Sequence, residues 1–205
     1  MPDLLWYAAY GSNLSAARFG HYLAGGRPEG AARTMAGARD ATPPRDTRAL
    51  ELPGSIFFGW ESPTWGGGIA FYDPDRTGRA LASAYLISRE QFVDLLHQEM
   101  HREVGDDLDL GPLWDSGGQD LGPGRYERLL RVDELEELPV VTFTCPRDQR
   151  PAVNPPADAY LTVIARGLAE THALDADAIS AYFVALEGVS QTPEHLRQVV
   201  RAALG

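Results

Sequence analysis

The chain has 205 residues, of which 44% are hydrophobic and 23% charged, which is typical of a folded globular protein and not of a disordered, collagen-like or coiled-coil chain. Its 29 acidic residues outnumber 18 basic ones, and the net charge of -11 argues against nucleic-acid binding. All basic residues are arginines, which excludes Schiff-base, P-loop and protein-kinase chemistry, because each needs a lysine amine.

The sequence contains one cysteine, Cys145, which excludes an intramolecular disulfide, a cysteine-rich zinc site and an iron–sulfur cluster. We therefore expect a reducing compartment and a cytoplasmic protein. The apolar stretch Leu4–Ala9 follows an acidic residue and is too short for a signal-peptide core or a membrane span. We interpret it as a first β-strand and expect no association with a membrane.

The first half of the chain is predicted to be rich in strands. The sequence Tyr10-Gly11-Ser12-Asn13 marks a tight turn after the first strand, and a helix is expected over residues 15–23. Residues 25–53 are rich in Gly, Pro, Arg and Asp, which indicates loops around one or two short strands. Three apolar runs separated by turn residues predict strands that pair with each other, at residues 55–60, 68–72 and 82–87.

A helix is then predicted from Ser88 to about residue 104. Gln91 follows Ser88 at the spacing of a capping box, and Gly105 is expected to end the helix. After an acidic, glycine-rich loop at 105–124, two more strands are expected at 125–132 and 140–144. The last third is predicted to be helical, at residues 157–169, 175–186 and Pro193–Leu204, with Thr192 as the N-cap of the final helix.

Strands followed by helices indicate an α+β fold, although the mixed order of elements leaves α/β open. No linker is long enough to separate two cores, so we expect a single domain over residues 1–205, with residues 188–205 as a C-terminal helical extension. The chain is expected to be a monomer or a homodimer.

A glutamate occupies an apolar position of the helix that begins after Ser88. On a helical wheel Glu99 falls within about 20° of Phe92, in the stripe shared with Leu95. Because burial raises the pKa of a carboxyl group, Glu99 is a candidate general base. The alternative is that it pairs with an arginine or reaches solvent at the helix edge. Glu103 is a weaker candidate, because it lies in the last predicted turn.

His97 and His101 have the i, i+4 spacing of two metal ligands. Glu99 lies roughly 160° from either histidine around the helix, unlike the arrangement in zinc proteases. We therefore expect both histidines to be solvated on the polar face, and neither a metal nor a cofactor is predicted.

The motif Tyr10-Gly11-Ser12-Asn13-Leu14 follows the first predicted strand, and it is similar to the N-terminal signature of the γ-glutamylcyclotransferase (AIG2-like) family. Further motifs resemble that family and occur in its order. Trp65-Gly66-Gly67-Gly68-Ile69-Ala70 is similar to its Trp-x-Gly-Gly-Ile-Ala strand, and the helix after Ser88 with Gln98-Glu99 is similar to its helix and catalytic glutamate. Pro156-Ala157-Asp158-Ala159-Tyr160 resembles its Pro-x-x-x-Tyr segment, and the resemblance extends from Leu4 to about Tyr182.

The resemblance implies a mixed β-sheet or small barrel flanked by helices. It also implies roles for individual residues: Tyr10, Gly11, Ser12, Asn13 and Leu14 as a substrate-binding loop, Glu99 as general base and acid, and Tyr160 as a pocket residue. From the residues alone, the Gly-Ser-Asn sequence can be only a turn, and Tyr160 an aromatic on the inner face of a helix.

The implied reaction is an intramolecular aminolysis without metal or cofactor. The α-amine of a γ-glutamyl group attacks its own γ-carbonyl carbon and releases an amine and 5-oxoproline. Backbone N–H groups of Gly11 to Asn13 would hold the substrate carboxylate or the oxyanion. Two alternatives remain: a non-catalytic small-molecule-binding module on the same fold, and a hydrolytic amidase or deacylase that uses the same glutamate.

Overall fold

The computed structural model describes residues 2–28 and 34–205, so the predicted loop region 25–53 lies partly outside the described residues. The chain forms two compact units, each assembled from separated stretches of sequence. The first unit contains Met1–Ala8, Ala17–Arg48 and Ala84–Arg150, and the second contains Ala9–Ala16, Ala49–Ser83 and Pro151–Gly205.

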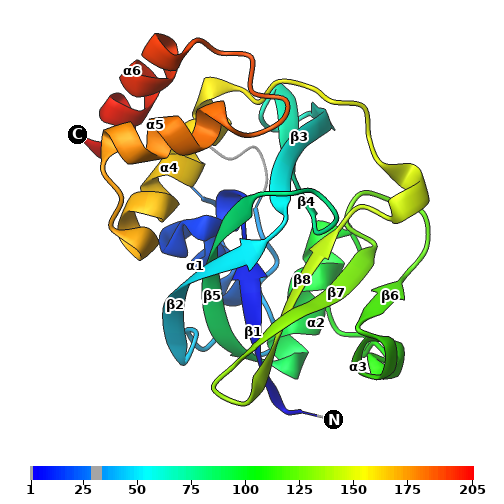
Figure 1. The fold of residues 1–205 in the computed structure, drawn as a ribbon. Helices are drawn as coiled ribbons and strands as arrows, with labels where there is room; N and C mark the ends of the chain where they lie inside the picture. The colour runs from blue at the N-terminus through cyan, green and yellow to red at the C-terminus, as the bar shows by residue number, and fades with distance from the viewer. Residues whose placement is uncertain (1, 29–33) are drawn as a thin grey trace. The chain divides into compact units, whose positions relative to one another are not determined.

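The described strands form one mixed six-stranded sheet and one two-stranded sheet. The order of the larger sheet is β2-β5-β1-β8-β7-β6, and the smaller sheet pairs β3 with β4 (Figure 1). The strands are β1 Leu4–Ala9, β2 Asp46–Pro53, β3 Ser55–Ser62, β4 Gly67–Asp73, β5 Arg79–Ser88, β6 Gly118–Asp120, β7 Arg128–Leu135 and β8 Leu138–Thr144. The α+β class with a mixed sheet is therefore confirmed.

Strand β1 lies between β5 and β8, so both of its edges are paired, and it is parallel to β8 with Trp6 opposite Val140. Its continuous apolar sequence suits such an interior strand, because side chains on both faces are buried. β8 pairs antiparallel with β7, which pairs antiparallel with β6.

The core of the first unit is a cluster of aromatic rings from the sheet and from two helices, α1 Ala16–Ala24 and α2 Arg89–Glu99. The Tyr7 ring lies 5.6 Å from Phe19 and 5.4 Å from Phe143, and Phe19 stacks on Tyr85 at 4.2 Å between ring centroids. Each buried ring removes a large apolar area from water, so this cluster fixes both helices on the strands.

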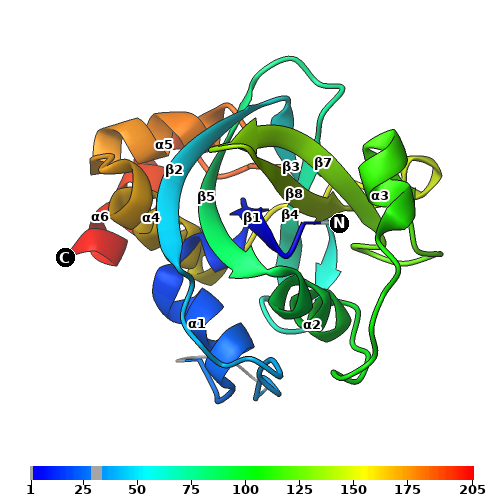
Figure 2. The same ribbon diagram turned by 90° about the horizontal axis from the view of Figure 1, so that it is seen from below.

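Three helices of the second unit lie together as a group in both views (Figures 1 and 2). They are α4 Asp158–His172, α5 Ala176–Val184 and α6 Pro193–Leu204. The predicted cap of α6 is confirmed: the Thr192 hydroxyl accepts a hydrogen bond from the His195 N–H at 3.2 Å, and Pro193 occupies the first turn. No helix of the described residues is long and apolar enough to cross a membrane.

Three expectations about secondary structure were wrong. The strand predicted at 82–87 became β5, which lies between β2 and β1 instead of pairing with β3 or β4. Apolar runs mark strands but do not encode their partners, and neighbours in sequence pair only about two thirds of the time. The loop predicted at 105–124 contains a short helix, α3 Gly111–Ser116, and strand β6, both too short to produce a periodic pattern.

The third difference concerns the end of α2, which was expected near residue 104. The helix ends at Glu99, because Met100 is its C-cap and His101 adopts the left-handed conformation with φ 58°. The left-handed residue that follows a helix is usually a glycine, and for this reason Gly105 was expected to mark the end of the helix.

Candidate functional site

The Tyr10–Leu14 segment follows β1 and belongs to the second unit. Residues Ser12–Leu14 form a single 3-10 turn, in which the Leu14 N–H donates to the Gly11 carbonyl oxygen at 3.0 Å. Tyr10, Asn13 and Leu14 are buried, whereas Gly11 and Ser12 are half-buried. Solvent therefore reaches this loop at Gly11 and Ser12.

The structure brings Tyr160 of α4 to this loop. Tyr160 is 2% exposed, and its hydroxyl accepts a hydrogen bond from the Ala70 N–H of β4 at 3.2 Å. A Cβ placed on Gly11 would lie 2.9 Å from the Tyr160 hydroxyl oxygen. Glycine at position 11 thus allows the phenol to lie directly against the loop backbone.

Trp65, which the sequence indicated only as part of a motif, also belongs to this group. The Trp65 ring, in the turn between β3 and β4, lies 5.2 Å from the Tyr160 ring and is half-buried. The Phe58 ring also lies edge-on to Tyr160, with 6.2 Å between the ring centroids. Together the rings of Trp65 and Phe58 hold Tyr160 in one orientation beside Gly11.

Residues of α4 and β5 contact the backbone at the end of the loop. A Cβ on Gly167 would lie 2.4 Å from the Leu14 carbonyl carbon, so helix and loop are in direct backbone contact. The Ser83 hydroxyl donates to the Leu14 carbonyl oxygen at 3.1 Å and lies 2.7 Å from the Thr171 hydroxyl. Because serine has one hydroxyl proton, Thr171 is the donor to Ser83. The loop is therefore fixed at its last residue.

The same end of α4 carries a histidine that makes stability depend on pH. His172 donates from Nε2 to the Ala82 carbonyl oxygen at 3.0 Å, and burial lowers the pKa of its imidazole below the ordinary value of 6.5. The folded protein therefore binds fewer protons at this site than the unfolded chain does. Its contribution to stability is complete above pH 6.5 and is lost as the pH falls through the lowered pKa.

We expect the free energy of unfolding to decrease as the pH falls below 6.5, and to decrease less in a His172→Gln variant, whose amide retains a donor for Ala82. Urea denaturation at a series of pH values measures this difference. Parallel pH profiles for the two proteins would contradict the assignment.

Glu99 lies in the first unit, as the last residue of α2. The expected capping box is confirmed: the Ser88 hydroxyl accepts from the Gln91 N–H at 3.1 Å, and the Gln91 side chain accepts from the Ser88 N–H at 3.0 Å. Glu99 itself is half-buried, so the burial expected from the helical wheel is only partly found. Glu103 lies beyond the helix and is exposed.

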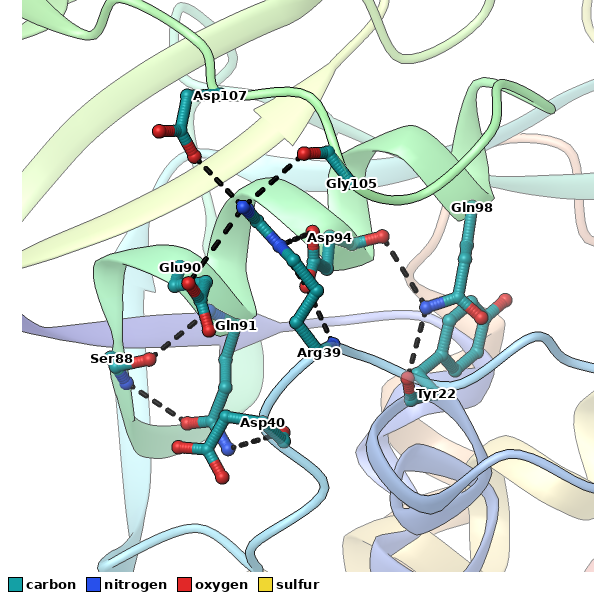
Figure 3. Close-up of polar contacts among 10 residues, drawn as sticks. All are labelled: Tyr22, Arg39, Asp40, Ser88, Glu90, Gln91, Asp94, Gln98, Gly105 and Asp107. Carbon is teal, nitrogen blue, oxygen red and sulfur yellow. Dashed lines mark hydrogen bonds and ion pairs between the residues drawn. The ribbon is translucent and has the colours of Figure 1, made fainter.

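The fully buried carboxylate of α2 is instead Asp94, on the side of the helix opposite the apolar stripe. Figure 3 shows Arg39 and Asp40 at this polar side, with Arg39 bound to Asp94 and the Gln91 amide donating to the Asp40 carbonyl oxygen at 3.1 Å. The expectation that this face is solvated was therefore wrong. His97 is also only 6% exposed, and it ends a run of seven consecutive buried residues in α2.

His101 is exposed, as expected, and its imidazole contacts the Arg125 guanidinium. Among the residues that the structure describes, no group of three or more His, Cys, Asp or Glu side chains is arranged to hold a metal ion. Of the predicted site residues, the structure thus joins the Tyr10–Leu14 loop with Tyr160 in one unit and places Glu99 in the other.

Comparisons with known proteins show which fold the chain has. No protein-family model matches the chain. A curated Arabidopsis thaliana protein named histone deacetylase 5 is 32% identical over 203 residues, an alignment that covers 87% of this chain. The chain spans only 30% of the length of that protein.

Solved structures match nearly the whole chain. A structure described as a gamma-glutamyl cyclotransferase superposes with a TM-score of 0.56 at 16% identity, covering 97% of this chain and 99% of the other. An uncharacterized human protein superposes with a TM-score of 0.54 at 17% identity, covering 98% and 99%. The chain therefore has the γ-glutamyl cyclotransferase fold.

Proposed function

We propose that this protein is a γ-glutamylcyclotransferase-like enzyme that converts a small γ-glutamyl amide into 5-oxoproline and a free amine. The observation that carries the proposal is the match of fold over 97% of this chain and 99% of a gamma-glutamyl cyclotransferase. The ordered motifs from Tyr10 to Tyr160 add to it, because fold alone does not specify a reaction.

In this proposal Glu99 transfers protons in both halves of the reaction. The substrate α-ammonium gives a proton to the Glu99 carboxylate, and the resulting amine attacks the γ-carbonyl carbon to form a new C–N bond. The original C–N bond then breaks, and Glu99 returns the proton to the leaving amine. A half-buried carboxylate supports this role, since a substrate can reach it while part of its surroundings exclude water.

The Tyr10–Leu14 loop would bind the γ-glutamyl group. Backbone N–H groups of Gly11 to Asn13 are proposed to hold the substrate carboxylate or the developing oxyanion. The support is the exposure of Gly11 and Ser12 beside a buried tyrosine hydroxyl that contacts Gly11. Because ring closure is intramolecular, holding the substrate in a near-attack geometry supplies much of the acceleration, and the proposal requires no metal or cofactor.

The product distinguishes this reaction from its alternatives. We expect the purified protein to form 5-oxoproline and free amine in equal amounts from at least one member of a panel of γ-glutamyl amines and dipeptides, as measured by mass spectrometry. Release of free glutamate would instead indicate hydrolysis. Binding of a γ-glutamyl compound without any product would indicate a non-catalytic binding module.

A further inference from the structure

A buried ion pair holds the loop at residues 37–42 on helix α2. The Arg39 guanidinium donates from Nε to both carboxylate oxygens of Asp94, each at 3.1 Å, and the Arg39 backbone N–H donates to Asp94 at 2.8 Å. The Asp94 side chain is 0% exposed, whereas that of Arg39 is 29% exposed. A carboxylate this buried requires a partner, so Asp94 fixes Arg39 firmly on the helix.

The same guanidinium also binds the chain after α2. Nη1 of Arg39 donates to the Gly105 carbonyl oxygen at 3.3 Å and to the Asp107 carboxylate at 3.0 Å (Figure 3). Asp94 precedes Glu99 and Asp107 follows it, so a single arginine ties together the two ends of residues 94–107. Glu99 lies within the segment that this tie closes.

The chain just after Glu99 leaves the regular helix. The Met100 and Arg102 N–H groups donate to carbonyl oxygens of the last helical turn, and His101 takes a left-handed conformation. Residues 101–109 then contain no helix or strand. Closing this segment reduces the conformations available to it, which lowers the entropy lost when Glu99 is held in one place.

A second tie reaches the residue next to Glu99. The Gln98 side chain donates from Nε2 to the Tyr22 carbonyl oxygen at 2.9 Å, and its Oε1 accepts from the Gly37 N–H at 3.3 Å. Gly37 and Arg39 belong to the same loop, so this loop contacts α2 at Gln98, in its last turn, and at Asp94, one turn earlier. The contacts converge on the last turn of the helix.

We propose that Arg39 is a positioning residue for the reaction, which holds the Glu99 carboxylate in its productive geometry by tying Asp94 to Gly105 and Asp107. The inference rests on the proposed function of Glu99 as the proton-transfer group. A displacement of about 1 Å at a reacting group is enough to lower a rate by about 10²-fold, so a residue that never touches the substrate can control kcat.

The test uses one variant that leaves the Arg39–Asp94 pair in place and one that changes Arg39 itself. Asp107→Asn weakens only the distal contact, and since the Asp107 side chain is 87% exposed, the fold is expected to persist. Arg39→Lys retains the charge near Asp94 but loses the planar fork that binds several acceptors at once. Asp177→Asn is the matched control, because Asp177 forms an exposed pair with Arg201 in the other unit.

For 5-oxoproline formation we expect kcat to fall about 3-fold to 10-fold in Asp107→Asn and further in Arg39→Lys, with KM changed by less than about 2-fold. Asp107→Glu should restore most of the loss, and Asp177→Asn should match the wild type. Equal kcat in all variants would overturn the inference and leave the proposed function standing. The same conclusion would follow if kcat and melting temperature fell together while KM rose. A wild-type protein that forms no 5-oxoproline would overturn both.

Discussion

Glu99→Gln is expected to lower the rate of 5-oxoproline formation by about 10²-fold to 10⁴-fold, because an amide cannot accept the proton of the substrate ammonium. Glutamine has nearly the same shape as glutamate, and Glu99 is only half-buried at a helix end. The melting temperature should therefore change little. Initial rates measured by mass spectrometry, together with a thermal melt, check both parts of the expectation.

Glu103→Gln is the matched control for this experiment. Glu103 lies four residues further along, is exposed and follows the same helix. It should retain wild-type turnover. If Glu103→Gln lost activity while Glu99→Gln kept it, Glu103 and not Glu99 would be the residue that transfers the proton. That result would overturn the proposed mechanism.

Gly167→Ala is expected to destabilise the protein, although alanine is the better helix former by about 1 kcal/mol. The new Cβ would lie 2.4 Å from the Leu14 carbonyl carbon and 2.6 Å from the Ser15 nitrogen. Helix α4 or the loop would have to move, at a cost of about 1–3 kcal/mol or more. Because Leu14 closes the proposed substrate loop, turnover should fall together with the melting temperature.

Gly20→Ala in α1 provides the comparison. Gly20 is also inside a helix, but nothing lies within 4 Å of the position that a Cβ would take. The substitution should therefore stabilise the protein by up to about 1 kcal/mol. Urea denaturation of both variants measures the change in the free energy of unfolding. The two changes should have opposite signs if the contact between α4 and the loop is as close as described. Stabilisation by Gly167→Ala would contradict that contact.

The elements that the sequence predicted well are those with local signals. The apolar run of β1, the Ser88 capping box and the Thr192-Pro193 start of α6 each depend on residues close together in the chain. The pairing of β5 and the burial of His97 depend on segments far away in sequence. A helical wheel treats the polar side of α2 as facing water, whereas the loop that carries Arg39 covers it.

The candidate site shows the same division. The Tyr10–Leu14 turn and Tyr160 were found through motifs, but no pattern indicates that a phenol on α4 lies against Gly11. The sequence did not indicate that Gly167 and Ser83 contact the loop. A close approach of two backbones appears in the sequence only as a glycine, and a buried serine cannot be told from any other small residue. Asp94 had one usable signal: a charged residue between Val93 and Leu95 in a helix.

The way the two units share the sequence has a consequence for how the chain folds as it is synthesised. Strand β1 lies between β5 and β8, and the first unit extends to Arg150, so most of the chain must be synthesised before its second partner, β8, emerges from the ribosome. The second unit needs its first residues, Ala9–Ala16, together with the C-terminal helices. Such non-local pairing slows folding. Nascent chains arrested before β8 should therefore remain sensitive to protease and bind chaperones.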